Sequence, residues 1–171
     1  DIIFVGRICE NKCQHKLIEF YSQYKKQNQI GKLYIVGKYD SSSDYYKLVS
    51  NTIKELHLET DVIVTGAVSE DELSSRYKNA SCFISFSEHE WFGVPIVEAS
   101  QYQIPVLALN KAAVQETLGG SPGIFEDLFE LESNLKKVLS DDQYRESIID
   151  FQNDVLSKNN YDSWKVYADA F

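Results

Sequence analysis

Short apolar runs alternate along most of this chain with longer segments of helical periodicity. The apolar runs lie at Ile2–Val5, Leu33–Val36, Val62–Thr65, Cys82–Phe86, Pro105–Leu109 and, very briefly, Ile124–Phe125. Apolar runs of this length are typical of strands that are buried on both faces. Because two parallel strands need a long crossover between them, the alternation predicts βαβ units and a parallel sheet with helices on both faces.

The segments between these runs carry the spacing and the start signals of helices. We expect helices after Asn11, over about 45–56, from Ser69, and over 95–102, 113–118, 128–139 and 142–157. Asn11 with Gln14, and Ser69 with Glu72, resemble capping boxes, in which two side chains satisfy backbone amides at the helix start. The whole pattern is Rossmann-like: an α/β fold with an open parallel sheet of about six strands flanked by helices.

The composition fits one folded domain that spans residues 1–171. The chain has 171 residues, of which 43% are hydrophobic, and this is enough for a single core. Its formal net charge of −9 argues against nonspecific binding of nucleic acid, and no basic amphipathic helix indicates adhesion to an anionic membrane. Any site for an anion must therefore be local.

Cys9, Cys13 and Cys82 are an odd number of cysteines without paired zinc spacing. They indicate reduced thiols in a cytoplasmic protein, with a disulfide between two of them as the alternative. The sequence contains no signal peptide and no apolar run of spanning length. It also contains no methionine, even at position 1, so we expect an excised fragment of a longer protein.

Polar residues and helix signals coincide after the fourth apolar run. Gly93 and Pro95 turn the chain into a helix, with proline expected at the first helical position. The backbone amides of Gly93, Val94 and Ile96 would then point at one spot, where a helix N-terminus favours a phosphate or a sugar oxygen.

Two carboxylates flank this turn. Glu90 lies on the loop before it and Glu98 lies one turn inside the helix. Both can line one crevice and accept hydrogen bonds from the hydroxyls of ribose or hexose. The structural alternative is that Glu98 only favours the helix dipole and that Glu90 is a solvated loop residue.

The residues around the turn resemble the Glu-x7-Glu signature of the family 4 (group 1) retaining glycosyltransferases. They read Ser87-x-x-Glu90-x-Phe92-Gly93-x-Pro95-x-x-Glu98-Ala99. Those enzymes have a catalytic core of two Rossmann-like domains, called the GT-B fold. The resemblance covers nearly the whole chain and implies their C-terminal, nucleotide-sugar-binding domain over residues 1–171, without the acceptor-binding N-terminal domain. The helices over about 127–171 would pack on this domain or bridge toward the missing one.

The resemblance implies a role for each residue at the turn. Glu90 would contact hydroxyls of the donor sugar. We do not assign it as a nucleophile, because a front-face reaction needs none and the sequence does not choose between the two. The amides of Phe92, Gly93 and Val94 would bind the sugar or the distal phosphate, and Glu98 would bind the ribose hydroxyls.

A second motif, Gly6-Arg7-x4-Lys12, follows the first apolar run. It places a guanidinium at a strand end and an ammonium at the start of the next helix, where both can reach one diphosphate. The alternative is a pair of solvated surface cations. By the resemblance, Arg7 and Lys12 bind the donor diphosphate and join Glu90 as catalytic residues, and Gly6 is donor-binding. Cys13 stands where the family usually has glycine.

The loop after the third apolar run is similar to the family's base-binding edge. Backbone groups of Val68 would read the base, while Glu70 either helps them or is only the acid of a helix start. Two other places depart from the family: Gly37-Lys-Tyr39 stands for Gly-x-Gly, and Gln103-Ile-Pro-Val106 for Gly-x-Pro-Val. These departures affect the expected loop shapes and not the expected fold.

We therefore expect the donor-binding domain of a retaining glycosyltransferase of polysaccharide biosynthesis. The complete enzyme would move a hexose-type sugar from a nucleoside diphosphate to a glycan or lipid-linked acceptor held by the missing domain, in the cytoplasm or at the cytoplasmic face of a membrane. No metal or other cofactor is expected, because Arg7, Lys12 and the Gly93 helix terminus supply positive charge and no Asp-x-Asp motif is present. This chain alone would be inactive. The alternative is a non-catalytic nucleotide-binding module or one chain of a split transferase.

Overall fold

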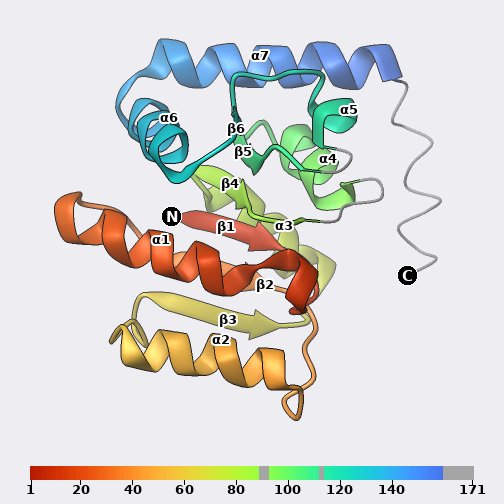
Figure 1. Ribbon diagram of the computed structural model, residues 1–171. Helices are drawn as coiled ribbons and strands as arrows, with labels where there is room; N and C mark the ends of the chain where they lie inside the picture. The colour runs from red at the N-terminus through yellow and green to blue at the C-terminus, as the bar shows by residue number, and fades with distance from the viewer. Residues whose placement is uncertain (89–92, 112–113, 160–171) are drawn as a thin grey trace.

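A computed structural model describes residues 1–88, 93–111 and 114–159 (Figure 1). In this part of the chain the strands form one six-stranded sheet in the order β3-β2-β1-β4-β5-β6, and every neighbouring pair is parallel. The strands are β1 Ile2–Val5, β2 Leu33–Val36, β3 Val62–Gly66, β4 Cys82–Ser85, β5 Val106–Leu109 and β6 Ile124–Phe125. The predicted α/β fold with an open Rossmann-like sheet is confirmed.

Helices cover both faces of the sheet. They are α1 Gln14–Gln27, α2 Asp44–Glu55, α3 Glu70–Asn79, α4 Val94–Gln101, α5 Val114–Leu118, α6 Leu128–Ser140 and α7 Asp142–Asn159, with a short 3-10 helix, η1, at Glu10–Lys12. Side chains of β1 alternate between two cores, because successive strand residues point to opposite faces. Ile2 and Phe4 pack with α1, α2 and α6, while Ile3 packs with α3, α4 and α5.

The start of α1 differs from the prediction. Its N-cap is Cys13, which has φ 52° and ψ 36° in the left-handed region and makes no side-chain cap. The predicted capping box of Asn11 and Gln14 is therefore wrong, because the chain first makes the 3-10 turn Glu10–Lys12, closed by the amide of Cys13 on the Glu10 carbonyl at 3.1 Å. Glycine adopts this conformation more readily than other residues, which fits the glycine that the resemblance implies at this position.

The three cysteines are free thiols, as their odd number predicted. Cys13 and Cys82 are buried, and burial raises the pKa of the Cys82 thiol to about 12. Both therefore act as small apolar residues of the core.

Polar side chains tie α7 to the segment that leads into β5. Gln152 is 1% exposed, and its side-chain amide donates to the Ile104 carbonyl at 3.0 Å and accepts from the Val106 amide at 2.8 Å. Gln103 and Asn153 exchange two further hydrogen bonds, of 2.7 and 2.9 Å. Helices α6 and α7 thus contact the rest of this domain through residues up to Leu156, and residues 160–171 lie outside the described residues.

Gln152→Ala is expected to lower the free energy of unfolding by about 2–4 kcal/mol. Two buried backbone groups would lose their partners, and each such loss costs about 1–3 kcal/mol. Asn153→Ala is the matched control, since it removes one amide pair nearer the surface and is expected to cost about 1 kcal/mol or less. Urea denaturation measures both values, and equal losses would contradict the structural role of Gln152.

Candidate functional site

The loops that follow the first four strands meet at one edge of the sheet. All of these strands are parallel, so their carboxyl ends lie together. The strand order reverses between β1 and β4, because β1 continues to β2 on one side while β4 continues to β5 on the other. In open sheets of this kind, ligands bind at such a reversal. The structure therefore brings the Gly6-Arg7 loop and the Gly93 turn to a ligand-binding edge.

The carboxyl ends of β1 and β2 are in direct backbone contact. Gly6 donates from its amide to the Val36 carbonyl at 2.8 Å, and Gly37 donates to the Gly66 carbonyl at 3.0 Å. A Cβ atom on Gly37, whose φ is 150°, would lie only 2.2 Å from the Gly6 carbonyl oxygen. Gly37 thus keeps the backbone before Arg7 in place, a role that no local pattern assigns to it.

Lys12 and Arg7 lie on either side of the same backbone turn. Arg7 is exposed, and its carbonyl accepts from the Gln14 side-chain amide at 2.9 Å. Lys12 ends the 3-10 turn, and its Cε would lie 3.9 Å from a Cβ on Gly6. The expectation that Lys12 belongs to the first turn of the next helix is wrong, because Cys13 separates it from α1. The turn nevertheless brings the Lys12 side chain close to Gly6, the residue that precedes Arg7.

Glu88 connects this turn to the loop after β4. Its amide donates to the Asn11 carbonyl at 2.9 Å, and its carboxylate pairs with Lys16 at 2.7 Å. The hydrogen bond to Glu88 raises the pKa of Lys16, although both side chains are 45% exposed and the pair is screened by water. The backbone hydrogen bond from Glu88 to Asn11 therefore contributes more than the ion pair with Lys16 to holding the start of the Glu-x7-Glu loop against η1.

The N-terminus of α4 lies at the same edge. Gly93 is its N-cap with φ 60° and ψ 36°, and Val94 is its first residue. Pro95 is therefore the second helical residue, whereas we predicted it to be the first. The Ile96 amide donates to the Gly93 carbonyl at 2.8 Å, so the prediction that it is available to a ligand is wrong. The Thr117 side chain of α5 packs against this turn, and a Cβ on Gly93 would lie only 3.3 Å from it. The amides of Gly93 and Val94 remain predicted ligand donors.

Glu98 on α4 is held by Tyr77 on α3. The Tyr77 hydroxyl donates to Glu98 Oε2 at 3.0 Å, and the Tyr77 ring stacks on Tyr102 with centroids 4.9 Å apart. Burial raises the pKa of the Glu98 carboxyl, while the Tyr77 hydrogen bond lowers it in part. Burial and the Glu98 charge together raise the pKa of Tyr77 well above its usual range. Tyr77 was not singled out in the sequence, because nothing in a helical pattern tells which partner a buried hydroxyl meets.

The loop before α3 carries the predicted base-binding residues. Val68 is half-buried and packs against the core under α3 and α4. Ser69 is the N-cap of α3 as predicted, and its hydroxyl accepts from the Glu72 amide at 3.3 Å. The second half of the predicted capping box is not formed, because the Glu72 carboxylate pairs with Arg76 at 3.2 Å. Glu70 is the exposed first residue of α3, a place that fits both of its predicted roles.

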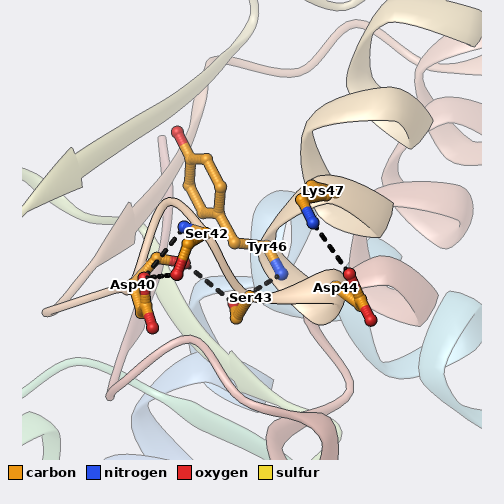
Figure 2. A network of polar contacts seen from close by, with 6 residues as sticks. All are labelled: Asp40, Ser42, Ser43, Asp44, Tyr46 and Lys47. Atoms are coloured by element: carbon orange, nitrogen blue, oxygen red, sulfur yellow. Dashed lines mark hydrogen bonds and ion pairs between the residues drawn. The ribbon is translucent and has the colours of Figure 1, made fainter.

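A side-chain network shapes the loop between β2 and α2, where the resemblance led us to compare Gly37-Lys-Tyr39 with Gly-x-Gly. Figure 2 shows the Asp40 side chain beside Ser42. The Asp40 carboxylate accepts from the hydroxyl of Ser42 at 2.6 Å and from its amide at 2.8 Å. These two hydrogen bonds lower the pKa of the Asp40 carboxyl. Ser43 donates to the Asp40 carbonyl at 2.8 Å and caps α2 by accepting from the Tyr46 amide at 3.2 Å. This network holds the loop in shape without the second glycine.

An open hollow of about 620 Å³ lies between this loop and η1. Its lining includes Arg7, Cys9, Lys38, Tyr39, Asp40 and Tyr45. Arg7 therefore borders both the hollow and the strand reversal, and Lys38 adds a second cation to the hollow's rim.

Two predicted site residues, Glu90 and Phe92, lie outside the described residues. Among residues 1–88, 93–111 and 114–159, no three His, Cys, Asp or Glu side chains gather where they could hold a metal ion. Over the same ranges, no helix has the length and apolar character needed to cross a membrane.

Comparison with known proteins identifies the family. The family described as glycosyl transferases group 1 matches residues 1–155. The chain is 26% identical over 154 residues to the capsular polysaccharide biosynthesis glycosyltransferase CapM of Staphylococcus aureus, covering 85% of this chain and 38% of CapM.

Two solved structures share the fold. One is the C-terminal domain of a group 1 family glycosyl transferase, LpcC, from Francisella tularensis, with a TM-score of 0.74, 21% identity and coverage of 92% of this chain and 84% of that one. The other is HepE of Anabaena in complex with UDP and glucose, with a TM-score of 0.77, 23% identity and coverage of 91% of this chain and 43% of HepE. The chain thus spans less than half of CapM and of HepE. Its match over residues 1–155 confirms the resemblance read from the motifs, and the chain belongs to the group 1 glycosyl transferases.

Proposed function

We propose that this chain is the donor-binding domain of a retaining transferase. The enzyme moves a hexose-type sugar from a nucleoside diphosphate to a glycan or lipid-linked acceptor. One observation carries the proposal: Arg7 and Lys12, beside the glycine contact of β1 and β2, share a sheet edge with the N-terminus of α4. Cations and helix amides are the groups that bind a diphosphate, and a carboxylate one turn further suits sugar hydroxyls.

The proposal assigns each group a part in the transfer. Arg7 and Lys12 neutralise the charge that develops on the departing nucleoside diphosphate, aided by the amides of Gly93 and Val94. In this scheme those groups take the place of a metal ion. Gly6 lets the diphosphate approach the backbone closely, because it has no side chain.

The remaining assignments follow the motif. Glu98 accepts from the ribose hydroxyls, Val68 reads the base through its backbone, and the Phe92 amide joins those at the helix start. Glu90 fixes the donor sugar by accepting from its hydroxyls as positive charge develops at the anomeric carbon.

The comparisons support the chemical class of the donor and the wider role. HepE is seen with UDP and glucose, and CapM acts in capsular polysaccharide biosynthesis. We extend a nucleoside diphosphate donor and a part in polysaccharide biosynthesis to this chain as proposals. Because the chain covers 38% of CapM, we assign the acceptor to a further domain of the complete enzyme. As a separate proposal, the reaction takes place in the cytoplasm or at the cytoplasmic face of a membrane.

Isothermal titration against uridine, adenosine, guanosine and cytidine diphosphates, with their sugar conjugates, tests the proposal. This chain is expected to bind one nucleotide class in preference to the others and not to transfer sugar, since the closed cleft needs a second domain. Absence of binding to every ligand would refute the proposed function.

Arg7→Ala and Lys12→Ala are each expected to weaken diphosphate binding by about 1.5–3 kcal/mol, the usual value of a hydrogen bond to a charged group. Binding of the bare nucleoside should change little, because the cations address only the phosphates. Lys26→Ala is the control, since it removes a cation at the far end of α1. Titration with the diphosphate and with the nucleoside separates the two effects, and equal losses for both ligands would assign the cations another task.

A further inference from the structure

Tyr77 is placed to act on Glu98, the one proposed site residue among those that the structure describes to which its hydroxyl donates. It is 0% exposed, its ring is held against Tyr102 at an interplanar angle of 14°, and its hydroxyl reaches across to α4. That hydroxyl lies 3.0 Å from Glu98 Oε2 and 3.5 Å from the Pro95 carbonyl. The ring cannot turn away from this position without leaving the core, so the direction of the hydroxyl is fixed by packing.

Tyr77 occupies only one oxygen of Glu98. Among the described residues, the hydrogen bond from Tyr77 is the single one to this carboxylate, and it falls on Oε2. A carboxylate offers about four acceptor positions, so Oε1 remains able to accept from a ligand. A side chain held at one oxygen presents the other in a defined direction, and such support keeps a binding group in its productive geometry.

We propose that Tyr77 is a positioning residue, which holds the Glu98 carboxylate so that its second oxygen accepts from a ribose hydroxyl of the donor nucleotide. This inference rests on the proposed function and deepens it. It assigns discrimination between ribose and deoxyribose to the pair of Tyr77 and Glu98, because an unheld carboxylate would lose the direction that selects the hydroxyl.

The role of the pair can also be tested through the pH dependence of ligand binding, because that dependence reports the protonation state of Glu98. Burial raises the pKa of this carboxyl and the Tyr77 hydroxyl opposes the rise. Among the described residues, the titratable group that faces the pair is Tyr102, which follows α4, while α7 meets α4 through the apolar contact of Val155 with Val97. Without the hydroxyl, the carboxyl gains its proton at a higher pH, so ligand binding should fall earlier as the pH is lowered.

Tyr77→Phe tests the proposal, with Tyr21→Phe as the matched control. Tyr21 is also 0% exposed and donates one hydrogen bond, to the Gly31 carbonyl at 2.7 Å, but it packs on the opposite face of the sheet. The probes are uridine, adenosine and guanosine diphosphates and their 2′-deoxy and 3′-deoxy forms, measured by titration calorimetry between pH 5 and 8.

Tyr77→Phe is expected to weaken binding of the preferred ribonucleotide about tenfold at neutral pH and to reduce its advantage over one deoxy form by about the same factor. The loss should grow at lower pH. Tyr21→Phe should lose comparable stability and keep both the affinity and the ribose preference.

If the unmodified chain binds ribonucleotides and Tyr77→Phe keeps the preference and the pH profile, the inference fails while the proposed function stands. If the unmodified chain binds none of the probes, both fail. Should Tyr77→Phe not fold, the double variant Tyr77→Phe/Glu98→Gln takes its place, since it leaves no buried charge without a donor. It should bind as Glu98→Gln does, and a further tenfold loss would overturn the inference.

Discussion

Gly37→Ala is expected to lower the free energy of unfolding by about 3 kcal/mol or more and to abolish binding of nucleoside diphosphates. The added Cβ would lie 2.2 Å from the Gly6 carbonyl oxygen and 2.6 Å from its carbon. Both atoms are backbone, so β1 and β2 must separate at their carboxyl ends to make room. The φ of 150° adds strain, because side chains rarely adopt it.

The control for this variant is Gly120→Ala. Gly120 also has a positive φ, of 82°, but a Cβ there would meet nothing within 4 Å. It is expected to cost about 1 kcal/mol, the conformational penalty alone. Chemical denaturation compares the two variants, and calorimetry with the diphosphate follows on whatever fraction of Gly37→Ala folds. Equal losses of stability would mean that the strand ends adjust freely and that Gly37 does not organise the site.

The fold was predictable because the relevant signal is local and repeated. Each apolar run is short, and each intervening segment carries helical spacing, so the chirality of βαβ crossovers leaves few arrangements. The predicted sheet and the order of elements are confirmed, with boundaries that shift by a residue or two. The cap of α3 was also predictable, since Ser69 and Glu72 are only three residues apart.

The details of the site depend on contacts that no local pattern encodes. Cys13 takes a left-handed conformation because a 3-10 turn precedes α1, and the same turn moves Lys12 out of the helix. Tyr77 meets Glu98 across 21 positions of the sequence, and Gly37 meets Gly6 through the register of two strands. The spacing of Glu90 and Glu98 predicted where the site lies, but it did not predict which residues hold the site in place.

Glu90→Gln and Glu98→Gln are expected to separate transfer from nucleotide binding. Glu98→Gln should weaken the nucleoside diphosphate and the nucleotide sugar alike, by about 1–3 kcal/mol, because both ligands carry the ribose that it addresses. Glu90→Gln should leave the nucleoside diphosphate affinity unchanged, since in the proposed function this residue meets only the sugar. Each change keeps the size of the side chain and removes its charge.

The larger effect is expected on turnover, in a protein that joins this domain to the acceptor-binding domain we propose. There Glu90→Gln should lower kcat by about 100-fold or more, the usual loss when a preorganised electrostatic group is removed at a centre that gains charge. Glu98→Gln should act mainly on KM, because its contact with ribose is the same before and during transfer. Matched titrations with the diphosphate and the diphosphate sugar, together with steady-state kinetics, decide the outcome. Full turnover by Glu90→Gln would remove that residue from the site and leave the carboxylate of Glu98 as the only one of the motif's two carboxylates that binds the donor.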